Sequence, residues 1–171
     1  MKNILIFAVL WLGLIVESTL FQIQPINVIQ PNLVLIILVV AALTRGPSTA
    51  LVLGVAIGFV QDVVYGSFIG LNAFTYGVTG YFASSVFAQF LHRNISITFF
   101  VVEVFTFIQQ WFTFALNRMF GITNYSWHAV LSQSLWQMMV NGVFLLLLYP
   151  LLVRMFRSKP SRRYKDSQES L

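Results

Sequence analysis

The chain has 171 residues, of which 58% are hydrophobic and 9% charged, and its formal net charge is +5. A soluble globular protein carries about 25% charged residues, so this composition excludes a water-soluble domain, a disordered segment and a nucleic-acid-binding module. It places the protein in the membrane class. The chain contains no cysteine, which excludes disulfides, thiolate catalysis and cysteine-based metal sites.

Apolar stretches of roughly span length predict an all-α integral membrane bundle with six transmembrane helices in a single domain. The predicted spans cover residues 4–22, 28–44, 48–65, 71–91, 95–117 and 133–153, and a basic cytoplasmic tail covers residues 154–171. The second span is the weakest, because its uninterrupted apolar core, Leu33–Leu43, predicts a short, tilted or partly re-entrant helix. Pro31 suits the first turn of that helix. Arg45, Gly46 and Pro47 predict its end and a tight turn.

The basic residues divide unequally between the two sides of the predicted bundle. Arg118 alone lies on one side. The other nine share the opposite side: Lys2, Arg45, Arg93, Arg154, Arg157, Lys159, Arg162, Arg163 and Lys165. Basic residues concentrate on the cytoplasmic side of membrane proteins, so both termini are predicted to be cytoplasmic. The tail is either a solvated end or a surface that contacts anionic lipid or a cytoplasmic partner.

Three acids fall inside predicted spans, where an ionisable group is costly: Glu17, Asp62 and Glu103. They either have buried structural roles or mark a path for protons or ions. Glu17 and Asp62 are expected in the outer half of the membrane. Arg118 is the basic residue available to them there, so a cluster of these three side chains is a hypothesis.

The third span carries a row of small residues that ends in an acid. Ala50, Gly54, Gly58 and Asp62 recur every four residues and therefore lie along one face of a helix. Gly54 and Gly58 form a GxxxG pair, which permits close contact between helices. This face is expected either to pack against the fourth span or to receive a transmembrane helix of a partner protein.

The stretch GFVQDVVYGSFIGLNAF, residues 58–74, resembles the signature of the MreD family of rod-shape-determining membrane proteins. Asp62, Gly66, Gly70 and Leu71 occupy the positions of the acid, the glycines and the leucine of that signature. The segment from Pro31 and Asn32 to Arg45 and Gly46 is similar to a second family pattern, Pro-Asp-Leu followed by Arg-Gly. Here Asn32 replaces the acid that is common in the family.

The resemblance implies a non-catalytic scaffold of the bacterial cell-wall elongation machinery in the cytoplasmic membrane. It implies as partners MreC, and also MreB, RodA and a penicillin-binding transpeptidase. It also implies a fold similar to the substrate-binding subunits of energy-coupling-factor transporters. The alternative function is therefore a membrane subunit that binds a small, vitamin-type molecule, although the first span lacks the Ala-x-x-x-Ala coupling motif of those subunits.

An enzymatic function is not expected from the sequence. Asp62 is the sole aspartate in a span, whereas intramembrane aspartyl proteases need two. His92 and His128 are predicted on opposite sides of the membrane, so they cannot share a metal ion. Neither a cofactor nor a metal is predicted.

Overall fold

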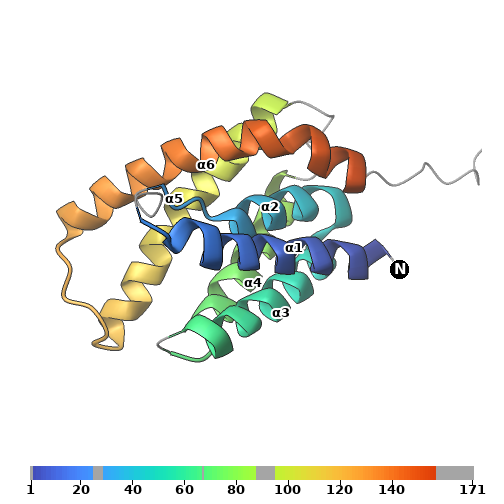
Figure 1. Cartoon of the computed structure of the whole chain (residues 1–171). Helices are drawn as coiled ribbons and strands as arrows, with labels where there is room; N and C mark the ends of the chain where they lie inside the picture. Colours follow the sequence, from blue (N-terminus) through green and yellow to red (C-terminus); the bar gives the residue numbers. More distant parts are fainter. Residues whose placement is uncertain (1, 25–28, 67, 88–94, 157–171) are drawn as a thin grey trace, which may run out of the picture.

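A computed structural model describes residues 2–24, 29–66, 68–87 and 95–156. These ranges form a bundle of α-helices (Figure 1) with one short 3-10 helix and contain no strand. The elements are α1 (Lys2–Thr19), η1 (Leu20–Gln22), α2 (Leu33–Arg45), α3 (Pro47–Tyr65), α4 (Leu71–Phe87), α5 (Ile95–Met119) and α6 (Trp127–Phe156). The predicted all-helical fold is confirmed. Arg93 and residues 157–171 of the predicted basic tail lie outside the described residues.

The short helix α2 forms the centre of the bundle. Every residue from Leu33 to Leu43 is buried, and α2 contacts each of the five other α-helices. A helix that is apolar on all sides is stable when it is surrounded by other helices, so its uniform composition explains its place. Asn32 caps its start, so Pro31 precedes the cap. The prediction that Pro31 occupies the first turn is therefore wrong.

Among the residues that the structure describes, four helical segments are long and apolar enough to cross a membrane: Asn3–Gln22, Pro47–Tyr65, Ile95–Met119 and Trp127–Phe156. At 1.5 Å per residue, α2 extends about 20 Å, which is short of the hydrocarbon thickness of about 30 Å. The helix is therefore short for a span, in keeping with its short apolar core. The described part of α4 has 17 residues, and the end of its predicted span, residues 88–91, lies outside the described residues.

The helices α3 and α4 form the closest pair in the bundle, and small residues bring their backbones into contact. A Cβ on Gly54 would lie 2.5 Å from the carbonyl oxygen of Tyr76, and a Cβ on Gly80 would lie 2.8 Å from that of Ala50. A Cβ on Gly58 would overlap the carbonyl oxygen of Asn72. Of the two expected uses of this face, the structure has intramolecular packing, because α4 occupies it.

The two ends of the bundle differ in which connections they carry. In Figure 1 the start of α1, the α2–α3 turn at Gly46 and the end of α6 lie at one end. The α3–α4 turn and the α5–α6 loop lie at the other end. The helix α6 begins at Trp127, six residues earlier than the predicted span, and the predicted loop before it is correspondingly shorter.

Candidate functional site

Asp62, near the end of α3, caps the start of α4. Its Oδ2 accepts hydrogen bonds from the backbone nitrogens of Gly70 at 2.9 Å and Ala73 at 3.0 Å. Its Oδ1 accepts from the backbone and side-chain nitrogens of Asn72, both at 3.0 Å. The side chain is 2% exposed. A helix start leaves several N–H groups without a partner, and here the preceding helix supplies the acceptor.

Glycine is required at the cap position itself. The carbonyl oxygen of Gly70 accepts the first intrahelical bond of α4, from Phe74 at 2.9 Å, so Gly70 is the N-cap residue. Its φ of +103° lies in a region that L side chains rarely adopt. Gly70 has no side chain with which to cap α4, and Asp62 takes that role. A Cβ on Gly66 would lie 2.5 Å from the carbonyl oxygen of Asp62, so the turn between these helices has no room for a side chain there.

Gly58 and Asp62 act on the same turn of α4. They lie one helical turn apart on α3, and both contact Asn72 and Ala73. The absence of a side chain at Gly58 lets α4 approach until its first N–H groups reach the Asp62 carboxylate. Close packing at Gly58 and capping by Asp62 therefore act on neighbouring parts of one helix contact. This explains why the row of small residues on α3 ends in an acid.

The start of α2 is capped in a similar way. Asn32 accepts a hydrogen bond through its Oδ1 from the backbone nitrogen of Leu35 at 2.8 Å. Oε2 of Glu17, from the preceding helix α1, lies 3.4 Å from the backbone nitrogen of Val34 and accepts from it. Two of the three acids in the helices thus stabilise the start of the helix that follows them.

A set of hydrogen bonds, which we call the central polar network, joins α2, α4, α5 and α6. The Tyr76 hydroxyl donates to Oδ1 of Asn32 at 3.2 Å, and the Asn32 backbone nitrogen donates to Oδ1 of Asn141 at 2.8 Å. Asn141 donates through Nδ2 to Oγ1 of Thr106 at 3.0 Å, and it accepts from Nε2 of Gln137 at 3.1 Å. Tyr76, Thr106 and Asn141 are fully buried.

Sequence reasoning identified Asn32 but missed its partners in this network. The signal available was the placement of amide side chains every four residues in the last span, at Gln133, Gln137 and Asn141. Such a row puts polar groups on one face of an apolar helix, where membrane helices use them to bond neighbours.

The expected cluster of Glu17, Asp62 and Arg118 is not formed. Among the described residues Arg118 makes no ion pair, and its guanidinium lies 5.9 Å from the centre of the Phe114 ring. The Asp62 oxygens bond to nitrogens of α4 instead. The physical reason is that α4 packs so closely on α3 that its own N–H groups reach the acid first.

Glu103 and Arg45 are placed differently from the capping acids. The buried Oε1 atom of Glu103 has no hydrogen-bond partner, and it faces α6 at Gly142, where a Cβ would lie 2.8 Å from it. Arg45 ends α2, and its buried Nε also has no partner. Gly46 follows it and connects α2 to α3.

Within the described part of the chain, no three histidine or acidic side chains come close enough to share a metal ion. The acids that sequence reasoning singled out mostly bond to helix starts, so the arrangement holds the bundle together. The roles of Pro31, Arg45 and Gly46 in any interaction with another molecule stay predictions.

Comparison with known proteins agrees with the resemblance seen in the sequence. The chain matches the family described as rod shape-determining protein MreD over residues 1–159. No curated protein and no solved structure matches the chain, so the expected likeness to transporter subunits receives no support. Because the match covers nearly the whole chain, this protein belongs to the MreD family of rod-shape-determining membrane proteins.

Proposed function

We propose that this protein is a non-catalytic scaffold of the cell-wall elongation machinery in the bacterial cytoplasmic membrane. It links MreC, and through it MreB, to the peptidoglycan synthases RodA and the penicillin-binding transpeptidase. The family match over residues 1–159 is the observation that carries this proposal. The match indicates the process in which the protein takes part, rod-shape determination. The scaffold role is our proposal.

The use of the polar side chains supports a scaffold. Asp62 makes four hydrogen bonds to α4, and Asn141 joins α2, α5 and α6. Groups that hold helix ends in place make a rigid bundle, and a rigid bundle presents a constant surface to partner proteins. In most complexes between pre-organised proteins, the backbone at the interface moves little on binding, although side chains change rotamer.

The distribution of charge supports an orientation with both termini in the cytoplasm. The ends of α2 and α6 lie at the end of the bundle that also holds the start of α1, and the end of α5 lies at the other end (Figure 1). Arg45 and Arg154 are in the last turns of α2 and α6, and Arg118 is in the last turn of α5. In this orientation the α3–α4 turn and the α5–α6 loop face the outer side, and the tail beyond α6 is available to anionic lipid.

Co-purification from native membranes tests the proposal. The full chain, carrying an affinity tag, is extracted in a mild detergent, and the proteins that accompany it are identified by mass spectrometry. We expect MreC, RodA or the transpeptidase above the level found with an unrelated tagged membrane protein of similar abundance.

Two results would count against the scaffold. Recovery of paired ABC-type ATPases with a coupling membrane protein would indicate a transporter subunit. Recovery of none of the elongation proteins, from membranes in which they are abundant, would remove the proposed partners.

A further inference from the structure

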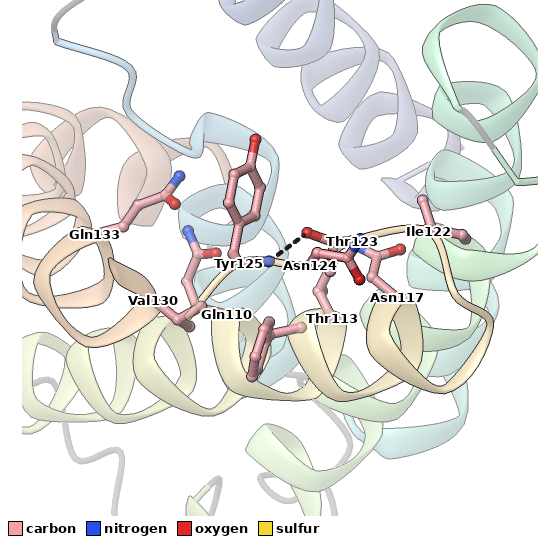
Figure 2. Close-up of a pocket in the computed structure, with 10 residues that line it drawn as sticks. Gln110, Thr113, Asn117, Ile122, Thr123, Asn124, Tyr125, Val130 and Gln133 are labelled. Atoms are coloured by element: carbon pink, nitrogen blue, oxygen red, sulfur yellow. Dashed lines mark hydrogen bonds between the residues drawn. The ribbon is translucent and has the colours of Figure 1, made fainter. Parts of the chain in front are cut away.

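A pocket of about 600 Å³ lies between the end of α5, the α5–α6 loop and the start of α6 (Figure 2). Its volume is within the range of small-molecule sites, about 300–1,000 Å³. The α5–α6 loop, whose residues line the pocket, lies at the same end of the bundle as the α3–α4 turn (Figure 1). It is separate from the capping acids and from the central polar network, because it shares no residue with either.

The end of α5 shapes this pocket. The backbone nitrogen of Ile122 donates to the carbonyl oxygen of Asn117 at 2.8 Å, and that of Gly121 donates to Arg118 at 3.1 Å. These two bonds, with a φ of +69° at Gly121, form a Schellman motif. The motif turns the chain sharply, so that the loop folds beside α5 and forms a second wall.

The lining combines polar and apolar side chains and carries no charge. Gln110, Thr113 and Asn117 follow one another at helical spacing on one face of α5, and Gln133 faces the pocket from α6. In Figure 2 the Gln110 and Gln133 amides lie on one side of the Tyr125 ring, and the Asn117 and Thr123 side chains lie on the other. None of the lining residues that the structure describes is acidic or basic.

Two of the lining side chains have buried atoms without a partner within the protein. Oγ1 of Thr113 and Oδ1 of Asn117 are both buried and make no hydrogen bond. A buried polar atom without a partner is costly, and most buried polar atoms in native proteins bond to another protein group or to ordered water. The two residues lie one turn apart on the same wall of the pocket.

We propose that this pocket binds a neutral carbohydrate of about disaccharide size. A sugar ring presents hydroxyl groups that both donate and accept, and the amides of Gln110, Asn117 and Gln133 also do both. The aromatic rings of Phe114 and Tyr125 in the walls offer apolar surfaces for the C–H face of the ring. A charged ligand is disfavoured because no described lining residue could neutralise it.

A peptide is the competing ligand, and the geometry favours it less. Extended peptides are recognised mainly by the free edge of a sheet or by a groove for alternate side chains. The walls here are two helices and a loop, whose side-chain amides converge from different directions. That arrangement suits a compact ring with hydroxyl groups on several sides better than an extended main chain.

Saturation-transfer NMR with the full chain in detergent micelles tests the proposal. The probes are N,N′-diacetylchitobiose and maltose, two neutral disaccharides, and N-acetyl-Ala-Gly-Ala amide as the neutral peptide. We expect saturation transfer to at least one disaccharide at millimolar concentration, and weaker transfer to the peptide. Thr113→Val removes the unpartnered hydroxyl with little change of shape, and we expect about three- to ten-fold weaker sugar binding.

Matched variants separate the pocket from the rest of the protein. Ser84→Ala removes another buried hydroxyl without a partner, on α4, and should leave sugar binding unchanged. Tyr125→Ala removes a ring from the pocket wall and should weaken sugar binding. Because this loop side chain is 68% exposed, the variant should fold normally. It therefore tests the proposal even if Thr113→Val does not fold.

Three outcomes would overturn the proposal: no transfer to either disaccharide, stronger transfer to the peptide, or sugar binding that Tyr125→Ala and Thr113→Val leave unchanged. This test is independent of the scaffold proposal, because the binding measurement needs none of the proposed partners.

Discussion

At the scale of single residues, Asp62 accounts for the acid in the family signature. Both of its oxygens accept hydrogen bonds, from Gly70, Asn72 and Ala73. An acid at the start of a helix also interacts favourably with the helix dipole. The carboxylate therefore stabilises the fold of the α3–α4 pair, and a proton or ion path is not needed to explain it.

We predict that Asp62→Asn destabilises the protein more than Glu103→Gln does. The new amide group would point a donor at N–H groups of α4, which we expect to lower the free energy of unfolding by about 2 kcal/mol. Glu103→Gln removes the same charge, but Oε1 of Glu103 has no partner to lose. Unfolding of both variants in mixed micelles with increasing SDS measures the difference. Equal loss of stability would show that the cap contributes nothing beyond its charge.

The residue scale also shows the limit of reading a sequence. The signature marks Asp62, Gly66 and Gly70 as important, but it does not say that the acid bonds to α4. That bond joins residues 8 to 11 positions apart across a turn, and it forms because Gly58 lets two helices approach. The sequence instead suggested Arg118 as the partner, since opposite charges attract, whereas packing keeps Arg118 on the outside.

At the scale of the elements, the α3–α4 pair depends on the absence of side chains at its contact. We predict that Gly58→Ala destabilises the protein, because the added Cβ would overlap the backbone of Asn72 and lie 2.6 Å from the Cα of Ala73. Backbone cannot move aside as a side chain can, so we expect a loss of about 2 kcal/mol. The stability in mixed micelles measures the effect.

Gly13→Ala is the matched control for that prediction. Its Cβ would lie 2.7 Å from Cδ1 of Ile37, the far end of a flexible side chain. Alanine also favours the helical state over glycine by about 1 kcal/mol, so this variant should be neutral or slightly more stable. If Gly13→Ala were as destabilising as Gly58→Ala, close backbone contact would not be the cause.

The central polar network couples helices that are distant in the sequence. We predict that Asn141→Ala and Thr106→Val are not additive, because their side chains bond to each other at 3.0 Å in a fully buried position. A double-mutant cycle in mixed micelles should give a coupling energy of about 1 kcal/mol. Additive effects would mean that this hydrogen bond does not contribute to the association of α5 with α6.

At the scale of the whole molecule, composition and periodicity predict the class of fold well. The apolar runs of Leu33–Leu43 and of the other helices are unambiguous, because nothing but burial or lipid tolerates such segments. The number of spans was not predictable in the same way. A run as apolar as α2 can cross a membrane or fill the centre of a bundle. Its length of 13 residues distinguishes these two roles only when the helices that surround it are known.

The start of α6 and the pocket were also beyond reach from the sequence. Residues 127–132, which mix apolar and polar side chains, lie outside the predicted spans, but they form the first turns of a 30-residue helix. Because α6 begins at an earlier residue than predicted, its connection to α5 is shorter. The pocket exists because that short loop must turn at Gly121 and run back along α5.

Depletion of the protein in its source bacterium tests the central claim, membership of the machinery that determines rod shape, most directly. Expression is placed under an inducible promoter, and cell length and width are measured by phase-contrast microscopy after the inducer is removed. We predict that cells become wider and round as the protein is diluted by growth, and that re-induction restores rods. Cells that keep their width and rod shape for many generations without the protein would contradict this account.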